Sequence, residues 1–151
     1  MGHYAPSPHA RATQGRYFPK TGTVISSRTM TRRRIDAAAV QAALAAVDAG
    51  TAPETGTLRD AVRALLATLA GAYPGRSVEV RVPPYGAVQC IPGPRHTRGT
   101  PPNVVETDPL TWLLVATGRL PWTEALATGR LTASGNRADL SDYIPLGPLS
   151  Q

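Results

Sequence analysis

The stretch Ser77-Val78-Glu79-Val80-Arg81-Val82 has the clearest local pattern in the chain, because its valines alternate with polar residues. An alternation with period 2 predicts a β-strand that buries one face. Pro83-Pro84 interrupts this pattern directly afterwards. Residues 85–91 are predicted to return as the second strand of a hairpin, with Val88 and Cys90 on one side of it.

Two helices are predicted before this strand. The first covers about residues 36–49, with Asp36 as its cap, and its narrow apolar stripe consists of Ile35, Val40, Leu44 and Val47. The second covers about residues 58–73, and Thr57 and Asp60 stand at the spacing of a capping box. Its apolar face recurs every three or four residues and consists of Leu58, Val62, Leu65, Leu66 and Leu69.

The chain after the hairpin is predicted to be a mixture of short elements. Residues 92–102 contain four prolines and two glycines and should form a loop, and residues 103–107 follow as a third strand. Asp108-Pro109 is a helix start, with a capping carboxylate and then proline at the first helical position. The later pattern predicts a helix ending at Gly118, a short helix over 121–129, a strand at 131–133 and a last helical turn at 139–144. Helices that segregate from a meander of strands indicate an α+β fold.

The 151 residues are enough for one domain, and their charge is unevenly distributed. Residues 1–34 hold seven basic and no acidic residues, whereas the rest holds nine basic and ten acidic ones, which gives 9 − 10 = −1. We therefore expect a disordered basic tail over residues 1–34, a domain over 35–146 and a short tail over 147–151. Two interpretations of the first tail stay open. It is an extension of a protein that starts near Met30, or a basic arm for acidic lipid headgroups or nucleic acid.

The domain itself is nearly neutral and is not expected to bind nucleic acid, because nucleic-acid-binding domains carry positive charge on the surface that meets the phosphates. The single cysteine, Cys90, excludes an intramolecular disulfide and fits a reducing compartment. No apolar run is long enough to span a membrane or to form the core of a signal peptide. We therefore expect the protein to be cytoplasmic.

From 107 to 144 the sequence resembles the C-terminal half of a sterol carrier protein domain. The motifs that carry the resemblance are Asp108-Pro109-Leu110-Thr111-Trp112-Leu113, Thr117-Gly118-Arg119-Leu120, Glu124-Ala125, the run from Gly129 to Asn136, and Ala138-Asp139-Leu140. Residues 80–90 and 93–107 are most similar to a bacterial branch of that family, of actinobacterial type, and the resemblance covers roughly residues 32–146.

The resemblance implies a curved, mostly antiparallel sheet with helices packed on one face. It also implies an apolar tunnel between the two layers for a sterol, a fatty acyl chain or a similar lipid. The candidate tunnel residues are Val78, Val80, Val82, Val88, Leu65, Leu69, Trp112 and Leu113. A dry core and a lipid tunnel use the same residue types, so both interpretations stay open at this point. Few aromatic residues (5%) and the proline-rich loop favour a narrow, acyl-sized cavity over a sterol-sized one.

Three polar residues of the loop, Arg95, His96 and Arg98, are candidates for binding a carboxylate or phosphate headgroup. The alternative is a solvated loop whose arginines bond neighbouring carbonyls. His96 beside Cys90 would suit a nucleophile and its base, but Cys90 stands in an alternating strand and is interpreted as a buried apolar residue. His96 is the one histidine outside the tail, so a metal site is not expected, and no nucleotide-binding or serine-nucleophile motif is present.

The sequence therefore predicts a non-enzymatic domain, without cofactor, whose partner is an apolar small molecule or lipid. The alternative is an interaction or accessory domain that keeps the fold and fills the tunnel with its own side chains. The sequence leaves the oligomeric state open.

Overall fold

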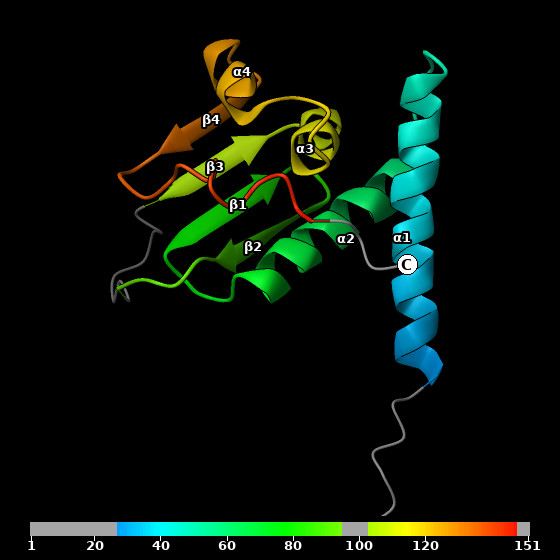
Figure 1. Ribbon diagram of the computed structural model, residues 1–151, viewed down its shortest axis with the longest axis horizontal. Helices are drawn as coiled ribbons and strands as arrows, with labels where there is room; N and C mark the ends of the chain where they lie inside the picture. Colours follow the sequence, from blue (N-terminus) through cyan, green and yellow to red (C-terminus); the bar gives the residue numbers. More distant parts are fainter. Residues whose placement is uncertain (1–26, 95–102, 148–151) are drawn as a thin grey trace, which may run out of the picture.

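The protein has an α+β fold in which a four-stranded sheet carries helices on one face (Figure 1). The computed structural model describes the backbone of residues 27–94 and 103–147 and the side chains of residues 37–94 and 103–147. In chain order the elements are α1 (Ser27–Asp48), α2 (Thr55–Ala72), β1 (Val78–Val82), β2 (Gly86–Cys90), β3 (Val104–Thr107), α3 (Pro109–Ala116), α4 (Trp122–Ala127) and β4 (Leu131–Ser134). The predicted fold class is confirmed.

The sheet has the strand order β2-β1-β3-β4. The pairs β1–β2 and β3–β4 are antiparallel, whereas β1 and β3 are parallel. The last residue of β2, Cys90, lies opposite the first residue of β1, Val78. The chain therefore leaves β2 at the end of the sheet where β1 begins, and β3 can start there and run parallel to β1. Two antiparallel pairs around one parallel pair confirm a mostly antiparallel sheet.

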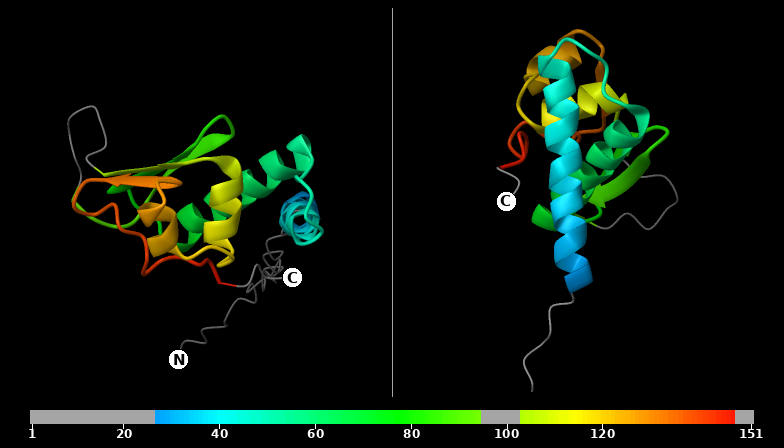
Figure 2. Two further views of the ribbon diagram at one scale, coloured as in Figure 1. Left: turned by 90° about the horizontal axis from the view of Figure 1, so that it is seen from above. Right: turned by 90° about the vertical axis from the view of Figure 1, so that its right-hand side faces the viewer.

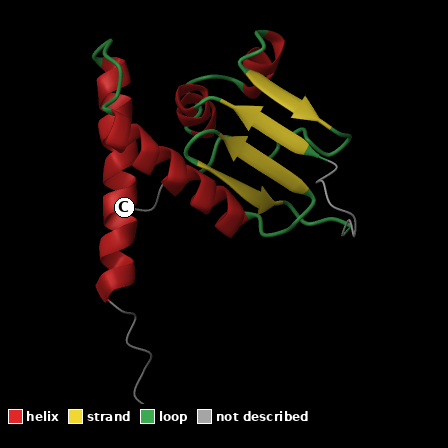
Figure 3. Ribbon diagram, turned by 180° about the vertical axis from the view of Figure 1, so that it is seen from behind, coloured by secondary structure: helices red, strands yellow, loops and turns green. Residues whose placement is uncertain are grey.

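One face of the sheet is buried and the other is open. The three valines of β1 are buried, and Glu79 and Arg81 between them point to the opposite face. Figure 3 shows the sheet from behind, and no helix covers the four strands on this face. The view from above in Figure 2 shows that α3 and α4 lie against the opposite face of the sheet. The predicted alternation of β1 is therefore confirmed, and so is the placement of the helices on one face.

α2 begins earlier than predicted, and its cap is Glu54 rather than Thr57. The Glu54 carboxylate accepts hydrogen bonds from the Thr57 backbone N–H at 2.8 Å and from the Thr57 hydroxyl at 3.1 Å. Because this carboxylate satisfies the first free N–H groups, the helix starts at Thr55. Asp60, the predicted partner in a capping box, instead forms an ion pair with Arg59.

α1 also begins earlier than predicted, at Ser27 rather than near Asp36. Residues 27–34, which the sequence predicts to be part of a disordered tail, are helical in the structure. The stretch contains no glycine or proline, and extending an existing helix costs far less than nucleating one. The apolar pattern could not show this, because it begins only at Ile35.

α1 packs chiefly against α2 at the edge of the domain (Figures 1 and 2). Val40 and Ala43 on its inner side are buried. Asp48 at its end forms an ion pair with Arg119, in the turn after α3. Both partners are about half exposed, so the pair contributes little and the apolar contacts hold α1 in place.

The predicted last helical turn at 139–144 is a turn outside any helix. The Ile144 N–H donates to the Leu140 carbonyl at 3.1 Å, but the helical bonds do not continue, because Pro145 follows and has no N–H. Leu140 and Ile144 are buried, and Tyr143 packs edge-on against Tyr73 with ring centroids 4.9 Å apart. Packing, rather than helix formation, fixes this segment.

None of the described helices is both long enough and apolar enough to cross a lipid bilayer.

The predicted start of α3 is confirmed. Asp108 caps the helix by accepting a hydrogen bond from the Thr111 N–H at 2.9 Å, and Pro109 is its first residue. Burial raises the pKa of the Asp108 carboxyl, but the hydrogen bonds from Thr111 outweigh it and hold the pKa below its usual value.

We predict that Asp108→Ala lowers the free energy of unfolding by about 1 kcal/mol, because the N-terminal N–H groups of α3 lose their acceptor. Urea unfolding at neutral pH measures this, and Asp108→Asn, which keeps an acceptor, should lose less. Because the folded-state pKa is lowered, the carboxylate stabilises the protein above its unfolded pKa, and this is lost as the pH falls through the folded value. The difference from the wild type should therefore shrink in acid. A loss as small as that of Asp142→Ala, at an exposed residue that caps no helix, would contradict the assignment.

Candidate functional site

The predicted tunnel residues come together in one continuous cluster. Six of the eight have 0% of their surface exposed and Leu65 has 1%, whereas Val88 is half-buried at the edge of the sheet. A side chain with no accessible surface contacts neither solvent nor an internal void that admits a water molecule. The space between sheet and helices is therefore closed around these side chains in this structure.

The interior is also predominantly apolar. Among the described residues, the only buried polar side chains belong to Ser77, Asn103, Thr107 and Thr111, and none of these is charged. Trp112 and Trp122 are both buried. Their indole N–H groups have no hydrogen-bond partner within the described part of the chain.

Partly buried apolar side chains surround this core. Along the line where α2 packs against β2 and the preceding turn, Leu66 approaches Gly86, and Tyr85 and Val88 remain half-buried. We call this line, marked by Arg63, Leu66, Tyr85 and Val88, the α2–β2 seam. It is a place where apolar surface of the core continues to the outside of the molecule.

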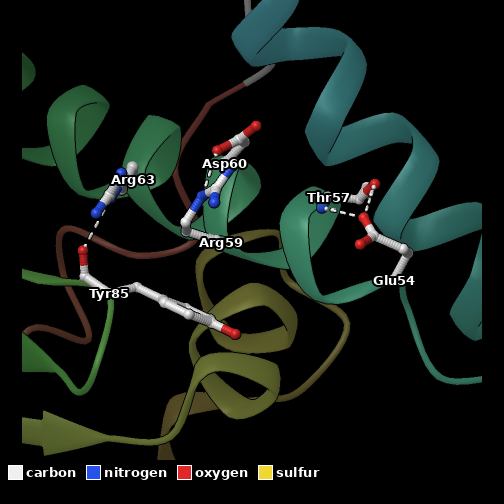
Figure 4. A network of polar contacts seen from close by, with 6 residues as sticks. All are labelled: Glu54, Thr57, Arg59, Asp60, Arg63 and Tyr85. Carbon is white, nitrogen blue, oxygen red and sulfur yellow. Dashed lines mark hydrogen bonds and ion pairs between the residues drawn. The ribbon is translucent and has the colours of Figure 1, made fainter.

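A polar network borders this seam (Figure 4). The Arg63 Nε–H donates to the backbone carbonyl of Tyr85 at 3.1 Å, which ties α2 to the turn before β2. Arg59, one helical turn earlier, forms an ion pair with Asp60 at 2.9 Å between Nε and Oδ1. This hydrogen bond from Arg59 is the main cause of the lowered pKa of Asp60, and the charge of Arg63 adds to it. The carboxylate therefore lies within the field of both guanidinium groups.

This network was not predicted from the sequence. The spacing of Arg59 and Arg63 places them on one face of α2, which the sequence does indicate. Tyr85 lies 22 residues further along the chain than Arg63, and only the packing of the hairpin on α2 brings the two together. No local pattern encodes that contact.

The predicted headgroup residues Arg95, His96 and Arg98 lie outside the described residues. Asn103, the first described residue after them, belongs to a buried polar cluster. The Asn103 side chain donates to the Ser77 carbonyl at 2.8 Å and accepts from the Arg137 N–H at 3.0 Å. These bonds join the starts of β1 and β3 to the chain after β4.

The backbone of Ile91, after β2, has a positive φ of 66°, which is rare for a β-branched residue. The Ile91 N–H donates to the backbone carbonyl of Tyr73 at 2.8 Å, and the Ile91 carbonyl accepts from the Ser77 hydroxyl at 2.9 Å. Such a conformation costs about 1–3 kcal/mol and persists only where its surroundings impose it. The direction in which the chain leaves β2 is therefore fixed by these bonds.

Cys90 is a buried apolar residue, as interpreted from the sequence. Burial raises the pKa of its thiol from 9.0 to about 11, which disfavours the thiolate that a nucleophile requires. Its suggested partner His96 lies outside the described residues. Within the residues that the structure describes, no three side chains of the metal-binding types gather to hold an ion.

We predict that Cys90 in the native protein reacts with iodoacetamide at pH 8 about a hundredfold more slowly than in the urea-unfolded chain. The raised pKa reduces the thiolate fraction by this factor, and burial adds to the effect. Mass spectrometry of quenched samples gives both rates. Equal alkylation rates in the native and the unfolded protein would show that Cys90 is accessible, and a role as nucleophile would then have to be considered again.

Comparison with known proteins agrees with the resemblance of the sequence. No curated protein matches the chain significantly. A family model described as bacterial SCP ortholog matches residues 54–146. The match begins at Glu54, the cap of α2, and ends at Leu146, whose N–H donates to the Ala116 carbonyl at the end of α3. The match covers more than half of the 151 residues, and the chain therefore belongs to the bacterial sterol carrier protein (SCP) family.

Proposed function

We propose that this protein is a non-enzymatic binding domain for an apolar ligand, with a fatty acyl chain or a lipid of similar width between its sheet and its helices. Family membership supports a lipid-carrier function. The observation that carries the proposal is the interior itself, which is an uncharged apolar layer whose surface continues outward at the α2–β2 seam.

A closed interior limits the affinity that such a ligand can reach. Each buried methylene contributes about 0.8 kcal/mol, so a chain of about 15 methylenes gains roughly 12 kcal/mol. A micromolar Kd corresponds to about 8 kcal/mol, which leaves about 4 kcal/mol for opening the core and for immobilising the ligand. We therefore expect binding that is micromolar or weaker, and a preference for a single narrow chain over a rigid sterol.

The proposal is tested on the full chain by native mass spectrometry and by titration with a fluorescent acyl probe. We expect co-purified fatty acid or lipid in the mass spectrum and saturable probe binding. A mass spectrum of apo protein alone, together with no probe binding, would refute the proposal.

A matched pair of variants locates the bound chain. Val88 and Val104 are both half-buried strand residues, but Val88 pairs with Val80 on the covered face whereas Val104 pairs with Glu79 on the open face. We predict that Val88→Thr, which places a hydroxyl beside the chain at nearly constant volume, weakens probe binding about threefold to tenfold. Val104→Thr should leave it unchanged. Equal effects of the two substitutions would mean that the probe does not bind between the layers.

A second candidate function is favoured by the closed packing of the tunnel residues. In that case the protein is an interaction or accessory domain that keeps the fold and fills the tunnel with its own side chains. It predicts no probe binding by the wild type, no co-purified lipid, and a protein partner instead.

A further inference from the structure

Arg63 has most of its hydrogen-bonding capacity free. A guanidinium group carries five N–H donors in a rigid fork that matches a carboxylate or phosphate. The Nε–H donates to the Tyr85 carbonyl, and within the described residues the terminal nitrogens donate to no protein group. The side chain is exposed, so these donors face the outside of the seam.

The carboxylates near Arg63 are already engaged. Arg59, Arg63 and Asp60 form a trio in which Asp60 lies near both arginines, and the charge of Glu54 also acts on Arg59. Asp60 makes its hydrogen bond to Arg59, which leaves Arg63 as the member of the trio without a bonded anion among the described residues. Glu54, the other acid of the network, is occupied by Thr57 at the start of α2 (Figure 4).

This cation stands next to half-buried apolar surface. The bond to Tyr85 fixes Arg63 at the seam, and the Tyr85 ring extends from that point alongside α2, toward the part of the helix that carries Arg59 (Figure 4). Val88 lies on the covered face of the following strand and is half-buried. An apolar strip with a free cation at its outer end is complementary to an amphiphile with an anionic head.

We infer that Arg63 binds the carboxylate or phosphate head of the ligand, whose apolar chain enters along the α2–β2 seam. This inference rests on the proposed function, because it concerns the same interior. It narrows the ligand class to single-chain anionic amphiphiles and gives the chain one direction, with its head at α2 and its tail in the core. Arg59 adds charge to the site, but its own Nε is held by Asp60.

Arg76 offers a matched control. Its Nε–H donates to one neutral acceptor, the Gln89 side chain, at 3.2 Å, much as Arg63 donates to Tyr85. It forms no ion pair among the described residues. Gln89 pairs with Glu79 on the open face of the sheet, away from the apolar interior. Arg63→Gln and Arg76→Gln therefore remove the same charge on opposite sides of the sheet.

The experiment is calorimetric titration of the full chain, as wild type and as both variants, with hexadecanoate and with hexadecan-1-ol below their aggregation limits. We expect the wild type to bind hexadecanoate about fivefold more tightly than the alcohol. Arg63→Gln should abolish this preference, because it weakens the binding of hexadecanoate about fivefold more than that of the alcohol. Arg76→Gln should keep the preference, and Arg63→Lys should keep part of it.

Several outcomes would overturn the inference. Arg63→Gln could retain the preference for hexadecanoate, or it could lose affinity for acid and alcohol equally, which would reveal a purely structural role. Inorganic phosphate alone could bind the wild type and not Arg63→Gln, which would make this a site for a free anion. If the wild type binds neither amphiphile, the proposed function itself fails, and that result is distinguishable from the others.

Discussion

The structure depends on the burial of one face of β1. Val78, Val80 and Val82 have no exposed surface, and β1 pairs with β2 on one side and β3 on the other. Burying three valine side chains contributes about 5 kcal/mol, and a slip of one residue in register would expose all three and bury Glu79 and Arg81 instead. The register of the central strand is therefore strongly specified. The position of the covering helices follows, because α2 and α3 supply the side chains that complete this layer.

Much of this is predictable from the sequence, because burial in regular elements is encoded by periodicity. The alternation in β1 and the apolar face of α2 are enough to identify Val80 and Leu69 as interior residues, and both are buried. Features that depend on competition between neighbouring groups are not predictable in this way. The α2 cap lies at Glu54 because its carboxylate accepts a hydrogen bond from the Thr57 N–H, and no periodicity distinguishes this cap from one at Thr57. The contact between Arg63 and Tyr85 depends on how the hairpin packs, and sequence patterns do not report the presence of a void within a layer of apolar residues.

The closed interior has to be reconciled with membership in a family of lipid carriers. A carrier must expose apolar surface for part of its cycle, yet an apolar layer open to water at all times would lose the stabilisation that holds the sheet to its helices. A core that closes on its own side chains resolves this, provided that opening costs less than the gain from burying a ligand chain. The absence of charged side chains among the buried residues that the structure describes helps, because an apolar ligand then displaces no ion pair.

The cost of opening differs across the sheet, and the topology indicates where it is lowest. Separating β1 from its neighbours would break hydrogen bonds on both sides, whereas β2 is an edge strand that pairs with β1 alone. Across the seam, the described side chains make one hydrogen bond between α2 and the turn before β2, that of Arg63 to Tyr85. A single such bond contributes only about 1 kcal/mol, so polar contacts oppose movement of this edge weakly. An anionic head that binds Arg63 would stabilise the guanidinium group when β2 and the turn before it move away from α2. In the proposed function, the same side chain would therefore close the empty core and hold the ligand in the filled one.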